Sequence, residues 1–172
     1  MQRLELARAE SEPLAFREGV TFPAEACGDE IVGVDDVVVS GLLEQTGRGF
    51  SLVGQVTGTA RLRCGRCLKE FTLALDEPVS LRLVSATQAP RDEEMQLSRD
   101  DLDVRYYEEP VVDLAELAAE QVQLATPLKP LCREACQGLC PRCGADLNQG
   151  FCACPRTTDS RWTPLLEWRK RS

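Results

Sequence analysis

Cysteine spacing is the feature that most constrains this chain. Six of its nine cysteines lie within residues 132–154, and two more form a C-G-R-C motif at Cys64 and Cys67. A C-x-x-C motif lets one tight turn direct two sulfurs at a single metal ion, and Zn²⁺ takes four such sulfurs at tetrahedral corners. Cys27 stands apart, so eight thiols remain, which is enough for two four-cysteine sites.

The motif Cys140-Pro-Arg-Cys143-Gly is typical of a zinc knuckle. Proline stiffens the turn, and the glycine after the second cysteine lets the backbone fold beneath the ion, so that amide hydrogens reach the sulfurs. The turn-rich DLNQG then leads to a C-x-C pair at Cys152 and Cys154. We expect these four cysteines to share one zinc ion.

The remaining thiols predict a second zinc site. Cys132 and Cys136 are four residues apart, a spacing that one helical turn would place on the same side. Joined to Cys64 and Cys67, they would staple the C-terminal tail to the rest of the chain. The alternative division uses Cys132, Cys136, Cys140 and Cys143 alone, so the sequence predicts one or two Zn²⁺ ions.

Disulfides, a redox dithiol and an iron–sulfur cluster are the other uses of such cysteines. No apolar run approaches the roughly 20 residues of a membrane helix, and the first residues lack a secretion signal, so we expect a cytoplasmic protein. A reducing compartment disfavours disulfides. C-G-R-C lies between expected strands rather than at a helix start, and the spacings do not match common ferredoxin runs.

The first 84 residues show the period-2 pattern of half-buried strands. From Phe50 to Leu62 small or apolar side chains alternate with polar ones, and Phe71 to Leu83 repeats the pattern. The segments TGRG, before Phe50, and C-G-R-C are the expected reversals. The sequence thus predicts a small antiparallel, curved or barrel-like β-sheet.

The chain then changes in composition. Residues 85–109 form an acidic connection, in which Leu102, Val104 and Tyr106 can add one short strand. Asp113 and Glu116 resemble the capping pair of a packed helix over 111–125, which Thr126-Pro127 ends. We therefore predict an α+β fold with two parts, a β-rich body at 1–125 and a Cys-rich metal-binding tail at 126–172 packed on it.

The net charge of −8 is unevenly distributed. Residues 1–124 hold twelve Lys or Arg against twenty-four Asp or Glu, whereas residues 125–172 hold eight against four. The body repels phosphate and the tail attracts it. The chain also has no histidine, phosphate-binding loop or dinucleotide motif. These absences, with closed all-thiolate sites, argue against an enzyme and a small-molecule substrate.

Basic residues gather around the cysteines. The candidates for contact with nucleic acid are Arg61, Arg63, Arg66 and Lys69 about the first C-x-x-C motif, and Arg142 within the second. Trp162 and Trp168 add aromatic side chains to the tail, and basic groups beside aromatic rings suit RNA. Charge that simply balances zinc thiolates is the alternative explanation.

Three segments together resemble the YceD family, the large ribosomal RNA subunit accumulation proteins. They are RLRCGRCLKEF, VVDLAELAAEQVQLATPLKPLC and CQGLCPRCGADLNQGFCAC, and the resemblance covers roughly residues 30–154. It implies a cytoplasmic, non-enzymatic factor needed for accumulation of large-subunit (23S) ribosomal RNA. Cys64, Cys67 and the six tail cysteines match the cysteines of the family.

The charge pattern and the resemblance lead to two hypotheses. In the first, zinc ties the tail and the hairpin together and presents a basic surface to ribosomal RNA. In the second, the acidic body binds a basic large-subunit ribosomal protein, and zinc only stabilises the adaptor. A thiol-redox protein is a third, less favoured alternative.

Overall fold

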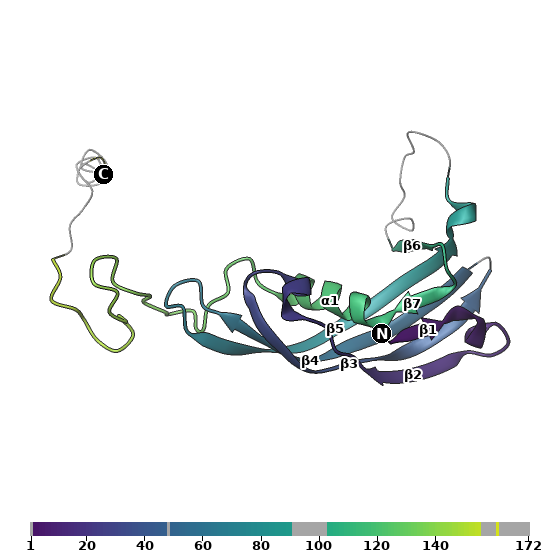
Figure 1. Cartoon of the computed structure of the whole chain (residues 1–172), viewed down its shortest axis with the longest axis horizontal. Helices are drawn as coiled ribbons and strands as arrows, with labels where there is room; N and C mark the ends of the chain where they lie inside the picture. Colours follow the sequence, from purple (N-terminus) through teal and green to yellow (C-terminus); the bar gives the residue numbers. More distant parts are fainter. Residues whose placement is uncertain (1, 48, 91–102, 156–160, 162–172) are drawn as a thin grey trace, which may run out of the picture.

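The computed structural model describes residues 2–47, 49–90, 103–155 and 161. Its main element is an open five-stranded sheet in the order β2-β3-β4-β5-β6, accompanied by a two-stranded sheet β1-β7 and by helix α1 (Figure 1). The expected combination of a β-sheet with one packed helix is confirmed, and the sheet is open rather than closed into a barrel.

The strands are β1 (Arg3–Glu5), β2 (Leu14–Gly19), β3 (Ile31–Thr46), β4 (Gly49–Arg63), β5 (Glu70–Ser85), β6 (Val104–Tyr107) and β7 (Val111–Asp113). The helices are η1 (Leu6–Ala9), η2 (Ala24–Cys27), η3 (Ala86–Gln88) and α1 (Leu114–Ala125).

One face of the five-stranded sheet forms the core. The alternation predicted from Phe50 to Leu62 is confirmed, because Leu52, Val56 and Leu62 of β4 are fully buried. They pack within two adjoining clusters that include Leu117 and Val122 of α1. Burial of these side chains, worth about 1.5–3 kcal/mol each, fixes the helix and the β1-β7 pair on this face.

Helix α1 begins later than the sequence predicted. Residues 111–113 belong to β7, which pairs with β1 in the register Arg3↔Asp113, so the helix starts at Leu114 instead of 111. The expected cap at Asp113 is confirmed, since its carboxylate accepts hydrogen bonds from the amides of Ala115 at 3.0 Å and Glu116 at 3.2 Å. The extended backbone of a capping residue explains why a strand leads directly into the helix.

The short strand expected near residues 102–106 is β6, but its direction differs from the other pairings. It runs parallel to β5, with Arg82 opposite Val104, whereas the pairs β2-β3, β3-β4 and β4-β5 are antiparallel. A parallel pair needs a long crossover, which the acidic connection supplies. Residues 91–102 of that connection lie outside the described residues.

The β4-β5 hairpin carries the C-G-R-C motif at its tip. The two strands pair from Gly49↔Val84 to Arg63↔Glu70, and both expected reversals, at TGRG and at C-G-R-C, are confirmed. After α1 the chain returns to this tip, where the amide of Gly65 donates to the carbonyl of Pro130 at 2.8 Å. Residues 126–155, called the arm below, then continue beyond the hairpin (Figure 1) and contain no helix or strand.

Replacing Asp113 with Ala removes two hydrogen bonds to the first turn of α1. We expect D113A to lower the free energy of unfolding by about 1 kcal/mol, and D113N to recover most of that loss because an amide oxygen also accepts at this position. Urea unfolding followed by circular dichroism measures both. Equal midpoints for D113A and the unsubstituted protein would contradict this role of the carboxylate.

Candidate metal centres

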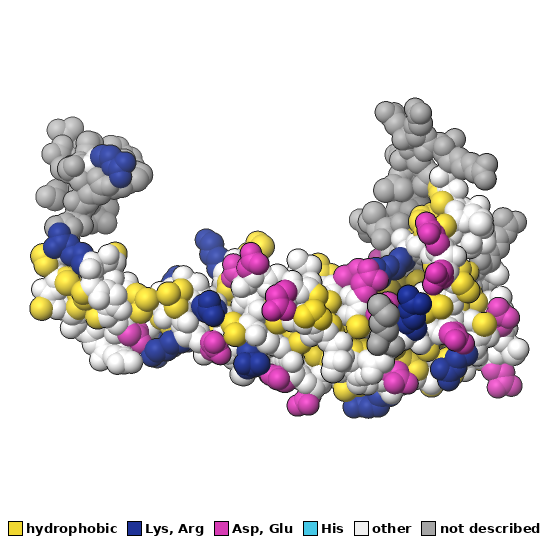
Figure 2. All heavy atoms as spheres, viewed as in Figure 1, with side chains coloured by type: hydrophobic (Ala, Val, Ile, Leu, Met, Phe, Trp, Pro, Cys, Tyr) yellow, Lys and Arg dark blue, Asp and Glu magenta, His cyan; other side chains and the backbone are white. Residues whose placement is uncertain are grey.

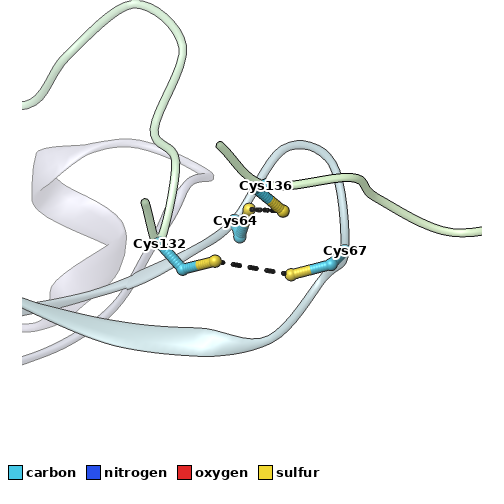
Figure 3. A group of neighbouring side chains, drawn as sticks. All are labelled: Cys64, Cys67, Cys132 and Cys136. Atoms are coloured by element: carbon cyan, nitrogen blue, oxygen red, sulfur yellow. Dashed lines mark hydrogen bonds between the residues drawn. The ribbon is translucent and has the colours of Figure 1, made fainter. Parts of the chain in front are cut away.

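The first cysteine group consists of Cys64 and Cys67 from the hairpin tip and Cys132 and Cys136 from the arm (Figure 3). The four side chains point toward one another, and their sulfurs all lie within 4.8 Å of one another. Cys64 and Cys136 sulfurs are 3.8 Å apart, and those of Cys67 and Cys132 are 3.7 Å apart. A tetrahedron with metal–sulfur bonds of about 2.3 Å has edges of about 3.8 Å, whereas a disulfide is about 2.05 Å long. The group can therefore hold a metal ion.

The second cysteine group consists of Cys140, Cys143, Cys152 and Cys154, whose sulfurs also lie within 4.8 Å of one another. Cys140 is buried and Cys143 is exposed, so this group is more open to solvent than the first. The structure thus separates the eight thiols as the favoured division of the sequence did. It does not form the alternative group, because Cys132 and Cys136 lie with the hairpin cysteines.

Each group contains a C-x-x-C turn with the same hydrogen bonds. In the arm, Gly144 N–H donates to Cys140 C=O at 2.9 Å and Cys140 N–H donates to Ala145 C=O at 2.8 Å. At the hairpin tip, Leu68 N–H donates to Cys64 C=O at 2.9 Å and Cys64 N–H donates to Lys69 C=O at 2.9 Å. The two knuckles are therefore equivalent in backbone geometry.

The residue after the second cysteine of each knuckle has a left-handed backbone. Gly144, with φ of 72°, adopts this conformation without steric cost, as the sequence predicted. Leu68 adopts it with φ of 60°, at a cost of about 1–2 kcal/mol for an L-residue, and its side chain is 59% exposed. The hairpin tip therefore carries backbone strain that the arm knuckle avoids.

Backbone amides point at one sulfur of each knuckle and stabilise its thiolate. Burial would raise the pKa of Cys64, but hydrogen bonds from the amides of Cys132, Cys67 and Arg66 outweigh it and lower that pKa to about 6. Amides of Cys143 and Arg142 lower the pKa of Cys140 to about 6 in the same way. Each group therefore contains a sulfur, that of Cys64 or Cys140, whose pKa favours the thiolate at neutral pH.

Two thiols, Cys132 in the first group and Cys154 in the second, keep their protons more strongly. Burial, followed by hydrogen bonds with neighbouring thiols, raises the pKa of Cys132 to about 12. Hydrogen bonding with Cys143, followed by burial, raises the pKa of Cys154 to about 12. Because a metal ion binds thiolates, loading either group displaces these protons, and acid weakens the binding.

Asn148 connects the two cysteine groups. Its side-chain amide donates to the sulfur of Cys136 at 3.5 Å and to Asp146 Oδ1 at 2.7 Å. Its side-chain oxygen accepts from the amide of Gln137 and from the guanidinium of Arg133, both at 2.8 Å. The loop that carries the second group is thereby fixed against a ligand of the first.

An ion pair between Lys69 and Asp146 makes a further link between the hairpin and the arm, with Nζ 2.6 Å from Oδ2. Two contributions lower the pKa of Asp146 from 3.8 to about 2. The larger is the hydrogen bond from the Lys69 side chain, and the smaller comes from hydrogen bonds that Asn148 donates. A folded-state pKa below its ordinary value means that the pair stabilises the fold above about pH 4. This stabilisation is lost as the pH falls toward 2.

Three of the five candidate RNA-contact residues already bond within the chain. Arg61 pairs with Asp35 at 2.9 Å, Lys69 pairs with Asp146, and Arg66 donates to the carbonyl of Cys136 at 2.8 Å. Arg63 and Arg142 are exposed, and within the described residues neither has an ion pair or a side-chain hydrogen bond. A phosphate would compete with existing partners at the first three residues but not at these two.

Charge is divided between the two ends of the molecule. Asp and Glu side chains gather over the body, whereas Lys and Arg side chains recur along the arm (Figure 2). A hollow of about 340 Å³ at the body end is lined by Glu108, Glu109, Asp113 and Glu116. Its two arginines are engaged, Arg3 with Glu109 and Arg105 with Glu116 and Glu120. That hollow repels anions.

Residues 52–167 match the model of the family described as large ribosomal RNA subunit accumulation protein YceD. The match spans more than half of the 172 residues. The chain therefore belongs to the YceD family, as the three quoted segments indicated.

Individual relatives agree with this assignment. An uncharacterised protein of Mycobacterium tuberculosis is 28% identical over 165 residues, which cover 94% of this chain and 77% of the relative. An uncharacterised protein of Mycobacterium bovis matches over the same shares. The large ribosomal RNA subunit accumulation protein YCED homolog 1, chloroplastic, of Arabidopsis thaliana is 33% identical over 61 residues, 35% of this chain and 19% of that protein. No solved structure matches the chain.

Cys27 is buried in the body core, apart from both cysteine groups, and burial raises its pKa. Among the described residues, no helix is long and apolar enough to span a membrane. Trp162 and Trp168 lie outside the described residues.

Sequence reasoning missed Asn148, Asp146 and the strained Leu68. The segment DLNQG was interpreted only as a turn, yet its Asp and Asn side chains bond to the hairpin and to Cys136. The available signal was a pair of short polar side chains immediately after a C-x-x-C-G turn, where they can reach nearby amides and sulfurs. Leu68 gave no such signal, because a leucine does not ordinarily mark a left-handed backbone.

Replacing Asn148 with Ala removes the hydrogen bond to Cys136 and the acceptor for Gln137 and Arg133. We expect N148A to weaken metal retention roughly 10- to 100-fold, the usual effect of losing a partner of a metal ligand. Competition with a chromophoric chelator measures this. Q149A is the matched control, because Gln149 is the exposed neighbour and makes only a 3.5 Å contact with Asp146. Equal retention in N148A and Q149A would contradict the role of Asn148.

Proposed function

We propose that this chain is a non-enzymatic cytoplasmic factor that supports accumulation of large-subunit (23S) ribosomal RNA, through its synthesis, its processing or large-subunit assembly. Zinc in the first cysteine group would hold the arm against the hairpin, and zinc in the second would order the arm itself, so that a basic surface faces the RNA. Membership of the YceD family supports the role in ribosomal RNA accumulation. A reducing compartment supports free thiols, and no disulfide links the described cysteines.

The observation that carries the proposal is the position of the two cysteine groups. They lie at the hairpin tip and in the arm, beside the exposed Arg63 and Arg142, at the opposite end of the molecule from β6 and β7, which line the body hollow (Figure 1). Zinc fits the donor set, because four thiolates at tetrahedral spacing suit a soft d¹⁰ ion. Such a site has no open coordination position, which supports a structural rather than a catalytic ion.

We also propose that residues 1–125 and 126–172 differ in what stabilises them. The body has its own apolar core, whereas the arm packs mainly on sulfur atoms, with Leu131 and Leu139 beside Cys64 and Cys136. Metal binding would thus supply the folding free energy of the arm.

A protein-binding adaptor is the second candidate function, and the acidic body favours it. The hollow lined by Glu108, Glu109, Asp113 and Glu116 complements a basic ribosomal protein. In this alternative, zinc stabilises the chain and RNA is not contacted. A thiol-redox role is disfavoured because Cys64 and Cys67 lie at a hairpin tip rather than at a helix start, and their sulfurs converge with those of Cys132 and Cys136 at the spacing of a metal site.

Neutralising the two available arginines tests the RNA proposal. We expect R63Q/R142Q to bind large-subunit RNA more weakly at every salt concentration, and the slope of log affinity against log salt to fall by about 1–2, because each phosphate contact contributes about 0.7–0.9. Filter binding from low to high salt measures the slope. R8Q/R17Q is the control, since Arg8 and Arg17 are also exposed but lie in η1 and β2, outside the hairpin tip and the arm.

An unchanged slope in R63Q/R142Q would contradict the assignment of these residues. An equal loss in R8Q/R17Q would show that the effect is one of net charge alone. If the unsubstituted protein binds no RNA but binds a basic ribosomal protein, the adaptor replaces the RNA-binding proposal.

A further inference from the structure

A hollow of about 240 Å³ lies beside the second cysteine group. Its walls are Pro141, Leu147, Phe151 and Pro155, together with three of the cysteines, and Arg142 stands among them. Phe151 is 88% exposed, which is unusual for so large an apolar side chain. Pockets for whole drug-sized ligands occupy about 300–1,000 Å³, so this hollow suits a smaller, flat group.

The chemistry of the hollow combines an aromatic ring, apolar walls and one cation. An unpaired nucleobase packs its π-face on aromatic side chains, and its phosphate pairs with an arginine. Arg142 is exposed, and in the described part of the chain it has no ion pair or side-chain hydrogen bond. Bases within a duplex are already stacked and cannot enter such a hollow, so a single-stranded segment is required.

The walls of the hollow are set by the cysteine group itself. Cys140, Cys152 and Cys154 belong to both, and the knuckle bond from Gly144 N–H to Cys140 C=O fixes Pro141 and Arg142 in the turn. A surface ordered in this way binds with less loss of conformational entropy than a mobile segment.

Charge selects an anionic occupant. The lining of this hollow contains one cation, Arg142, and no carboxylate, whereas the hollow at the body end is lined by Glu108, Glu109, Asp113 and Glu116. An uncharged apolar side chain from a protein partner would gain nothing from Arg142. A nucleotide uses both the ring and the cation.

We propose that this hollow binds one unpaired base of single-stranded RNA, with the base against Phe151 and the adjoining phosphate on Arg142. The inference rests on the proposed function and specifies which form of RNA the arm takes and where. Leu147, Pro141 and Pro155 exclude water from the edges of the base.

The test uses full-length, metal-loaded protein and a single-stranded oligoribonucleotide containing one 2-aminopurine, whose fluorescence falls when the base stacks. We expect the unsubstituted protein to quench it. F151A should bind roughly 5- to 150-fold more weakly, lose the quenching and keep the salt slope, because stacking contributes about 1–3 kcal/mol per base. F151W should retain both affinity and quenching.

Two controls separate stacking from misfolding and from charge. L128A removes another highly exposed apolar side chain, outside the hollow, and should bind like the unsubstituted protein. R142Q should lower the salt slope by about 1 while retaining part of the quenching. Metal content per chain must be the same in all variants.

The possible failures are distinguishable. If F151A binds and quenches like the unsubstituted protein, the hollow takes no base, although RNA binding itself stands. If the unsubstituted protein binds neither the oligonucleotide nor large-subunit RNA, the proposed function fails first. If F151A leaves RNA binding intact but loses a protein partner, the occupant is a peptide and the inference is overturned.

Discussion

The position of the arm relative to the body depends on the contact between the four sulfur atoms of Cys64, Cys67, Cys132 and Cys136. The body builds an apolar core in the ordinary way, with one sheet face covered by α1 and the β1-β7 pair. The arm has no helix or strand, and among its residues 126–155 only Pro130, Cys136, Gly138 and Cys140 are buried. In the proposed account, two groups of four thiols, at the spacing of a metal tetrahedron, take the place of an apolar core. Structural zinc in small motifs contributes about 10–16 kcal/mol, enough to order such a segment.

The long β4-β5 hairpin is what makes the first cysteine group possible. Two of its ligands come from the hairpin tip and two from residues about sixty-five positions later, so the group exists only when the body is folded. The second group is local in sequence but is tied to the first through Asn148 and through the Lys69–Asp146 pair. These contacts therefore link the body core to the first group and the first group to the second. The basic end of the molecule is placed at a distance from the acidic body as a result.

The sequence predicted much of this because its signals are periodic or local. Alternation from Phe50 to Leu62, the cap at Asp113 and both C-x-x-C turns each follow from residues close together in the chain. The joining of Cys64 and Cys67 to Cys132 and Cys136 was predicted from the count of thiols rather than from local pattern. The start of α1 at 111 was wrong because β1 captures residues 111–113 as a strand, and pairing with the N-terminal segment has no local signature.

Other features were beyond sequence reasoning because they depend on tertiary contacts. Three of the basic candidates bond to groups that lie 26 to 77 positions away in the chain. These pairs are Arg61 with Asp35, Arg66 with the Cys136 carbonyl, and Lys69 with Asp146. The parallel direction of β6 depends on a crossover through the acidic connection. The hollow at Phe151 is formed by residues of 140–155 and shares three cysteines with the second group, so it too depends on how that segment folds.

Counting metal ions per chain tests the central claim most directly. Native mass spectrometry of untagged protein, purified under reducing conditions without added metal, gives the number and identity of bound ions in one experiment. The account predicts two zinc ions, and after their removal by a chelator it predicts rapid hydrogen exchange at residues 126–155 while the body stays protected. Metal-free protein with an arm that resists exchange would contradict it.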